Sequence, residues 1–189
     1  MQKSPGNPGD LPSVDRFTWL CSYVIEFTVC ALCGWLYEEG LELAVNHAYA
    51  DRGLLHLPLL PIYGFGGLLV IFLFRKRRHW LFVFGVSTLA TTVLELAASY
   101  PIERIMGYLP WYYGAWPLNF EGRISVFSSL IFGALALLLV KAVHPLCRWI
   151  AERPAWLVRT LGLVLGAVLL ADTAWTFLPV CAGAGGAAP

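Results

Sequence analysis

Long apolar runs separated by short polar stretches dominate this chain. A helix needs about 20 apolar residues to cross the hydrocarbon core of a bilayer, and inside that core its backbone groups must bond to one another. Five runs meet or approach this length, over Phe17–Leu43, Leu59–Phe74, Trp80–Tyr100, Ile124–Val143 and Trp156–Leu178. The pattern therefore predicts an all-α fold, a polytopic membrane helix bundle with about five transmembrane helices.

Two parts of the pattern depart from a plain spanning helix. The second run is short and begins with Pro58, Pro61 and several glycines, so we expect its outer end to be irregular or partly re-entrant, with non-helical backbone around Tyr63 lining a cavity. The segment Pro101–Arg123, between the third and fourth runs, is rich in tryptophan and tyrosine, which favour the membrane interface. We expect an interfacial aromatic segment there, as a helix or a lid.

The composition agrees with a membrane protein made of one bundle. Hydrophobic residues make up 58% of the 189 residues and charged residues 13%, a balance that a soluble domain of this size does not show. Residues 1–16, with several prolines and glycines, are predicted to form a flexible cytoplasmic tail. Residues 17–178 form the transmembrane bundle, and residues 179–189 form a flexible C-terminal tail.

The distribution of charge predicts the orientation. With the N-terminus in the cytoplasm, ten of the thirteen basic residues face inward, among them the cluster Arg75–Arg78, as the positive-inside rule requires. Eight of the twelve acidic residues then lie toward the outside. We predict a multi-pass protein of the cell membrane (the inner or plasma membrane), with an outer face that attracts cations.

Three acidic residues lie inside predicted spans at similar depth. Glu38, Glu95 and Asp172 are each about six residues from the outer end of their run, roughly 9 Å deep at about 1.5 Å per residue. A charge at mid-membrane costs about 2.5–3.5 kcal/mol, so these carboxylates are expected to share an outward-open polar site if their helices face one another. Carboxylate–arginine pairs that lock the bundle, a ligand or ion site, and a catalytic site all remain open.

Other reactive side chains give weaker signals. Glu26, alone in the inner half of the first run, is interpreted as a proton relay or as a neutral acid bonded to a neighbouring helix. Cys30 and Cys33 form a CxxC without the setting of a redox or zinc motif, so we expect buried thiols. The four histidines lack metal-ligand spacing, although His47 and His56 could join a metal with a nearby glutamate. No metal, cofactor or catalytic residue is predicted, and nucleotide-binding and esterase motifs are absent from the sequence.

Four strings in order along the chain resemble a bacterial membrane family of type IV ABC-transporter permeases, the CmpB-like group. They are GWLYEE at Gly34–Glu39, DRGLLHLPLLPIYGFG at Asp51–Gly66, LELAASYPIER at Leu94–Arg104 and PWYYGAWPLNFEGRIS at Pro110–Ser125. The family pattern differs at Tyr112, where it has an aspartate, and at Asp51, where it has an asparagine. The resemblance implies transport and leaves the substrate open.

Mapping the family pattern onto these strings and adding the outer-side arginines gives the candidate site. The ligand-binding residues that we expect are Glu38, Arg52, Tyr63, Glu95, Arg104, Trp111, Asn119 and Arg123. The first functional hypothesis is a permease-like or transport component with an outward-facing polar site, working as a homo-oligomer or with a partner membrane subunit, and possibly a separate ATPase. The alternatives are a membrane-embedded enzyme acting on lipid-linked substrate at the outer leaflet, and an accessory or scaffold subunit. The sequence does not decide whether the chain is an enzyme, although the missing motifs favour a non-enzymatic role, and nothing in it indicates nucleic-acid binding.

Overall fold

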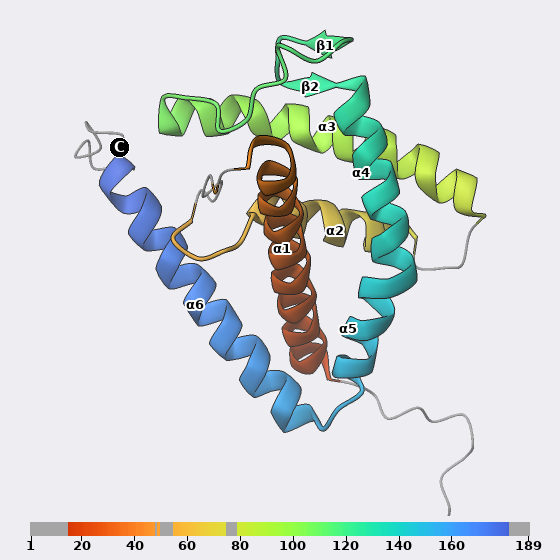
Figure 1. Cartoon of the computed structure of the whole chain (residues 1–189). Coiled ribbons are helices and arrows are strands. Elements are labelled where there is room, and N and C mark those ends of the chain that lie inside the picture. Colours follow the sequence, from red (N-terminus) through yellow and green to blue (C-terminus); the bar gives the residue numbers. More distant parts are fainter. Residues whose placement is uncertain (1–14, 48, 50–54, 75–78, 182–189) are drawn as a thin grey trace, which may run out of the picture.

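The computed structural model describes residues 15–47, 49, 55–74 and 79–181, and most of these are helical (Figure 1). The elements are α1 (Arg16–Asn46), α2 (Pro61–Leu73), α3 (Trp80–Met106), β1 (Asn119–Phe120), β2 (Ile124–Ser125), α4 (Val126–Leu138), the π-helical turn η1 (Leu139–Val143), α5 (His144–Ala151) and α6 (Ala155–Cys181). The predicted all-α class is confirmed. The cluster Arg75–Arg78 and most of both predicted tails lie outside the described residues.

Four stretches of helix are long and apolar enough to cross a bilayer. They are Arg16–Ala44, Trp80–Met106, Val126–Ala151, which joins α4, η1 and α5, and Ala155–Pro179. The remaining apolar helix, α2, has 13 residues. It is therefore about 20 Å long at about 1.5 Å per residue, against a hydrocarbon core of about 30 Å. The described part of the chain thus has four helices of spanning length and one short helix where five spans were predicted.

The second predicted run is regular where irregular backbone was expected. α2 begins with Pro61 in its first turn and continues without interruption through Tyr63 and Gly64, so the prediction of non-helical backbone around Tyr63 is wrong. Proline fits the first turn of a helix because the backbone donor that it lacks has no partner there. Irregular backbone is found instead before Pro61, over residues 55–60.

The third and fourth helices extend beyond their predicted ends. α3 passes through Pro101 and ends at Met106, followed by Gly107 in the left-handed conformation, instead of ending at Tyr100. The fourth helix continues past Val143 as α5, to Ala151. Proline is tolerated in membrane helices, which is why it is a weaker stop signal here than in a soluble protein.

α1 lies in the middle of the molecule, with α6 along one side and α4 and α5 along the other (Figure 1). α6 approaches α1 closely at Gly162, where an added Cβ would lie 2.8 Å from the backbone Cα and carbonyl oxygen of Cys21. Gly162 and Gly166 form a small-xxx-small pattern, which lets membrane helices pack closely. Cys21, Ile25 and Val158 form the apolar core of this contact.

The same two helices are also joined by polar groups at the start of α1. Asp15 caps α1 by accepting a hydrogen bond from the backbone N–H of Thr18. Arg159 of α6 lies 3.0 Å from Asp15 Oδ1 and donates to Thr18 Oγ1 at 2.7 Å. The hydrogen bond from Thr18 and the neighbouring guanidinium lower the pKa of the Asp15 carboxyl below its usual value.

Of the segment Pro101–Arg123, for which a helix or a lid was expected, the first six residues continue α3 and the rest forms a loop and a short hairpin. β1 and β2 pair antiparallel, Asn119 with Ser125 and Phe120 with Ile124. Asn119 accepts a hydrogen bond from the backbone N–H of Gly122, whose φ of 68° is a conformation that glycine adopts without strain. Figure 1 shows the hairpin at the end of the molecule where α3 crosses above α1.

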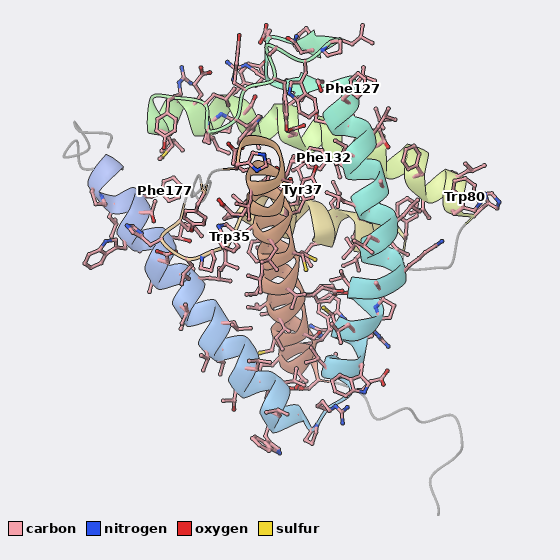
Figure 2. All side chains as sticks on the ribbon, in the orientation of Figure 1. Trp35, Tyr37, Trp80, Phe127, Phe132 and Phe177 are labelled. Carbon is pink, nitrogen blue, oxygen red and sulfur yellow. The ribbon has the colours of Figure 1, made fainter. Side chains whose placement is uncertain are left out.

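Large apolar side chains cover much of the outer surface. Figure 2 shows side chains pointing outward from α3 and α6, with Trp80 at one end of α3. Leu170 and Trp175 of α6 are 73% and 74% exposed. Such a surface is expected where lipid or another membrane subunit covers the protein.

Candidate functional site

Two carboxylates on different helices each accept a hydrogen bond from a tyrosine. Glu38 of α1 accepts from the hydroxyl of Tyr63 in α2 at 2.5 Å. Glu95 of α3 accepts from the hydroxyl of Tyr113, in the aromatic segment, at 2.8 Å. Glu38 also interacts electrostatically with Glu95 and with Tyr113. We call these four residues, Glu38, Tyr63, Glu95 and Tyr113, the tyrosine–carboxylate cluster.

Glu95 is the most buried carboxylate of this cluster. It is 3% exposed, and its Oε1 atom accepts the hydrogen bond from Tyr113. Its Oε2 atom is buried and has no hydrogen-bond partner in the structure. A buried carboxylate oxygen without a donor is costly, so it indicates a place where a ligand, a water molecule or a proton completes the site.

Local features of the chain place both tyrosines. Gly34 of α1 leaves room for the ring of Tyr63, which a Cβ at this position would overlap. Tyr113 is held by the hairpin, since its backbone N–H donates to the carbonyl of Gly122 at 2.7 Å. The indole of Trp111 donates to the carbonyl of Arg123 at 3.0 Å and fixes the same loop.

Burial keeps Tyr113 in its neutral form. Loss of solvent is the largest influence on this side chain and the charge of Glu95 is the next, and both raise the pKa of the phenol well above its usual value of about 10. Tyr113 is therefore a hydrogen-bond donor to Glu95 at neutral pH.

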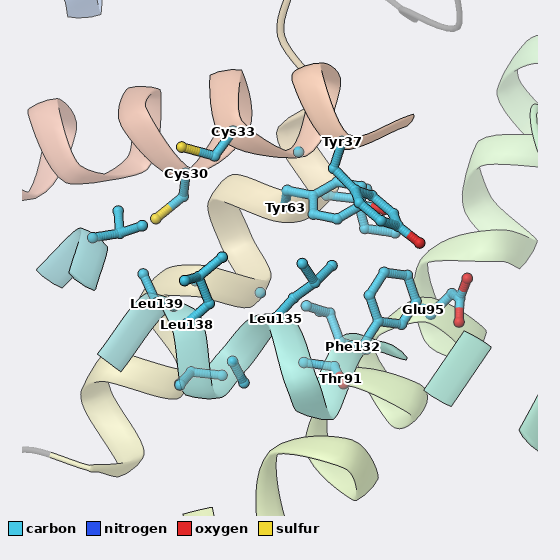
Figure 3. Close-up of a pocket in the computed structure, with 18 of the residues that line it drawn as sticks. Cys30, Cys33, Tyr37, Tyr63, Thr91, Glu95, Phe132, Leu135, Leu138 and Leu139 are labelled. Atoms are coloured by element: carbon cyan, nitrogen blue, oxygen red, sulfur yellow. The ribbon is translucent and has the colours of Figure 1, made fainter. Parts of the chain in front are cut away.

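The cluster lies at the meeting point of two cavities. The central cavity, of about 440 Å³, lies between α1, α2, α3 and α4 and reaches from Glu95 to Cys30 and Leu139 (Figure 3). A larger groove of about 1240 Å³, which we call the α1–α6 groove, is lined by α1, α6 and the aromatic segment, and also by residues of α2, α3 and α4. Tyr37, Ile62, Tyr63, Leu94, Glu95 and Phe132 line both.

Arg123 lies apart from the cluster, where it joins the hairpin to α3. Its guanidinium forms ion pairs with Glu103 and with Glu121, the latter at 3.3 Å, and lies 4.3 Å from the centre of the Tyr100 ring. The hydrogen bond to Glu103 raises the pKa of Arg123 further above its usual value. Sequence reasoning allowed this arginine to neutralise the buried carboxylates, but it pairs with carboxylates nearer the hairpin.

The other predicted site residues have different positions. Trp111 lines the α1–α6 groove. Asn119 bonds to Gly114, Trp116 and Gly122 within the hairpin. Arg104 is exposed in the last turn of α3. Arg52 lies outside the described residues.

Asp172 does not join Glu38 and Glu95, and the prediction of one site for all three is wrong in this respect. Its carboxylate accepts from the backbone N–H groups of His56 and Leu57 and lies 3.1 Å from Nδ1 of His56. Asp172 thus holds the segment before α2 against α6. Its depth along the helix was predicted, but depth alone does not fix the direction in which a helical side chain points.

A second buried pair was predicted only in part, since the sequence indicated Glu26 but not its partner. Glu26 of α1 lies 2.6 Å from Nδ1 of His144, the first residue of α5. Of the two interpretations offered for Glu26, this contact gives it a hydrogen-bonded partner on a neighbouring helix. His144 was missed because the fourth span was predicted to end at Val143.

Four of the cysteines are free thiols, and they differ in burial. Cys21, Cys30 and Cys147 are buried free thiols, whereas Cys33 is exposed, contrary to the expectation for the CxxC pair. Among the residues that the structure describes, no group of three or more histidine, cysteine or acidic side chains is arranged to hold a metal ion.

Four long apolar helices and a buried polar cluster between them define a multi-pass membrane protein. A family model described as "Putative ABC-transporter type IV" matches residues 25–177, most of the 189-residue chain. The chain belongs to this family, as the four strings indicated. No curated protein and no solved structure matches it.

Proposed function

We propose that this protein is a permease-like component of a membrane transporter, whose tyrosine–carboxylate cluster binds the transported molecule. The chain is a membrane protein of a transport-related family, by the family match and its apolar helices. The proposal adds that the cluster faces outward, that the N-terminus is cytoplasmic and that the membrane is the cell membrane. Ten of the thirteen basic residues lie on the predicted inner side, which supports this orientation.

One observation supports the site more than any other. Glu95 carries a buried carboxylate oxygen with no hydrogen-bond partner, at the junction of two cavities. A residue that served only to lock α3 in place would be expected to have both oxygens bonded to the protein. The second predicted carboxylate, Glu38, lines the α1–α6 groove together with Glu95.

Further subunits are part of the proposal. The described part of the chain has four helices of spanning length, which are few to enclose a complete transport path across the membrane. We therefore propose a homo-oligomer or a partner membrane subunit. The exposed apolar side chains of α6 suit such a contact. A separate ATPase would supply the energy, in keeping with the family to which the chain belongs.

The enzyme alternative gains no support from the site. Of the three outer-side arginines that could assist catalysis, Arg123 is engaged by Glu103 and Glu121, Arg104 is exposed, and Arg52 lies outside the described residues. Binding and transport remain the function that the described geometry supports best.

The test is solute exchange in proteoliposomes, which needs no energy source. Vesicles holding the purified chain are mixed with a panel of amino acids, amines and small cations, and exchange across the membrane is measured by mass spectrometry. We expect Glu95→Gln to lower the rate of solute exchange by about tenfold or more, because a charged hydrogen-bond acceptor is lost. Glu103→Gln is the matched control, since Glu103 lines neither cavity, and it should exchange like the parent.

Two results would contradict the proposal. One is a parent chain that exchanges every solute at the rate of empty vesicles and also binds none of them in detergent. The other is a Glu95→Gln variant that folds normally and exchanges as fast as the parent.

A further inference from the structure

The chemistry of the cluster favours a positively charged ligand. Glu38 and Glu95 are both acidic, and the side-chain bonds that they accept among the described residues come from the neutral phenols of Tyr63 and Tyr113. The unbonded oxygen, Glu95 Oε2, belongs to a buried side chain that lines both the central cavity and the α1–α6 groove, and Glu38 lines the groove. A cationic donor would satisfy that oxygen and balance the charge.

The walls of the cavity favour an organic ammonium group over a bare metal ion. The rings of Tyr37 and Tyr63 lie 6.3 Å apart between centres, and those of Tyr63 and Phe132 lie 5.6 Å apart. Aromatic faces attract ammonium groups, and alkylated ammonium needs fewer oxygen ligands than a metal ion does. No metal-binding group was found among the residues that the structure describes.

Beyond the cluster the cavity is apolar. From Glu95 it runs between α1, α2 and α4 past Leu135 to Cys30 and Leu139, as Figure 3 shows. Its volume of about 440 Å³ is typical of sites that enclose a small molecule. A ligand that fills it must carry a hydrocarbon part as well as a charged head.

We infer that the central cavity binds a membrane lipid with an ammonium headgroup. The headgroup nitrogen donates to the carboxylate of Glu95 and is attracted by Glu38, while an acyl chain lies along Leu135 and Leu139. The lipid is favoured over a water-soluble amine because three helices of spanning length and the short apolar helix α2 form the apolar part of the cavity. This inference rests on the proposed function in one respect, since both assign ligand binding to the same cluster.

Lipid selectivity tests this inference directly. The purified full-length chain in detergent micelles is given equal amounts of phosphatidylethanolamine and phosphatidylglycerol with the same acyl chains, and retained lipid is measured by native mass spectrometry. We expect the parent to prefer phosphatidylethanolamine by about tenfold, equivalent to about 1.4 kcal/mol. Glu95→Gln should bring the two lipids close to equal retention, and Glu103→Gln, outside the cavity, should keep the preference.

Two further experiments separate the contribution of the lipid's acyl chain from that of its headgroup. Leu135→Trp fills the apolar part and should remove phosphatidylethanolamine while leaving the carboxylates in place; Leu135→Phe replaces it if the tryptophan variant does not fold. Free ethanolamine at the same concentration should fail to displace the lipid. Displacement by free ethanolamine would overturn the lipid assignment in favour of a soluble amine.

Other outcomes also decide the matter. Equal retention of both lipids by the parent, or an unchanged preference in Glu95→Gln, overturns the inference. If solute exchange depends on Glu95 but lipid preference is absent, the proposed function stands and the lipid assignment fails. If the preference depends on Glu95 but the parent neither exchanges nor binds any solute, the lipid site is supported and the transport proposal fails.

Discussion

The hydrogen bond from Tyr113 to Glu95 connects the loop that carries the hairpin to the centre of the helix bundle. Tyr113 is partly buried, and its hydroxyl lies 2.8 Å from Glu95 Oε1. The bond requires the neutral phenol, because a phenolate cannot donate a proton. The pKa of Tyr113 is raised above its usual value by burial and by the charge of Glu95, so folding and protonation of this residue are linked.

This linkage predicts a loss of stability in alkali. A group whose pKa is raised by folding stabilises the protein below its unfolded pKa, about 10 for tyrosine, and that contribution falls as the pH rises above it. The melting temperature of the parent should therefore drop more steeply between about pH 9 and 11 than that of Tyr113→Phe. Tyr112→Phe, at the exposed neighbouring position, should follow the parent. Parallel pH profiles for parent and Tyr113→Phe would contradict the prediction.

The single residues of the site were predictable only in part. Glu38 and Glu95 stood out because carboxylates are rare in apolar runs, and Tyr63 and Trp111 because of the family strings. The partners could not be predicted, since the rotation of each helix and the path of the loop at Tyr113 are set by tertiary packing. The same limitation explains why Asp172 was grouped with residues that it does not meet.

At the scale of helices, the contact between α1 and α6 depends on Gly162. A Cβ at this position would lie 2.6–2.8 Å from atoms of Cys21, two of them in the backbone, whereas at Gly166 it would lie 3.6 Å from a Val24 methyl group. Gly162→Ala should destabilise the protein by about 1–3 kcal/mol through overpacking, while Gly166→Ala should change stability by less than about 0.5 kcal/mol. Thermal unfolding in one detergent compares the two, and equal effects would show that the helices do not pack closest at Gly162.

The start of α4 depends on a capping box. Ser125, 2% exposed, accepts from the backbone N–H of Ser128, and the Ser128 hydroxyl bonds back to the Ser125 N–H. Ser125→Ala should cost about 1 kcal/mol, or about 2–4 °C in melting temperature for a chain of this size. Ser22→Ala, which removes a hydroxyl bonded within its own helix, is the control and should change little. A melting temperature of Ser125→Ala equal to that of the control would show that the box contributes little.

The elements themselves were largely predictable from the apolar runs. All five runs correspond to helices, because the spacing and length of an apolar run indicate a membrane helix. Their ends were less predictable, since α3 passes through Pro101. The hairpin turn at Asn119–Gly122 was not predicted either, because the sequence pattern indicated only an interfacial helix or lid. The backbone groups of such a loop are hydrogen-bonded by particular side chains, such as that of Asn119, and a hydropathy pattern does not identify them.

At the scale of the whole molecule, α1 packs against α2, α5 and α6, whereas α3 packs mainly against α4. Figure 1 shows α6 on one side of α1 and α4 with α5 on the other. The tyrosine–carboxylate cluster joins α1, α2 and α3 near the hairpin, and the Glu26–His144 pair joins α1 to α5 toward the opposite end. Which helices contact one another could not be predicted from the sequence, because apolar runs indicate the number of helices and not their packing partners.

The Glu26–His144 pair should therefore be coupled in stability. Glu26 is almost fully buried, so removing His144 leaves its carboxyl without the partner that it has now. Breaking a buried pair costs up to about 3–5 kcal/mol, and less here because the side chain of His144 is 33% exposed. His144→Leu and Glu26→Leu should each destabilise the protein, and the double variant should cost less than the two effects added, by about 0.5–3 kcal/mol.

The double-mutant cycle is measured by unfolding in a single detergent, with all four proteins at the same concentration. An apolar pair of similar volume leaves no buried polar group unbonded, which is why the double variant is expected to recover stability. Strictly additive effects would mean that the two side chains do not stabilise one another across α1 and α5. In that case the end of the bundle opposite the cluster would be held by apolar packing, such as that of Cys30, Val70 and Leu139, and not by this pair.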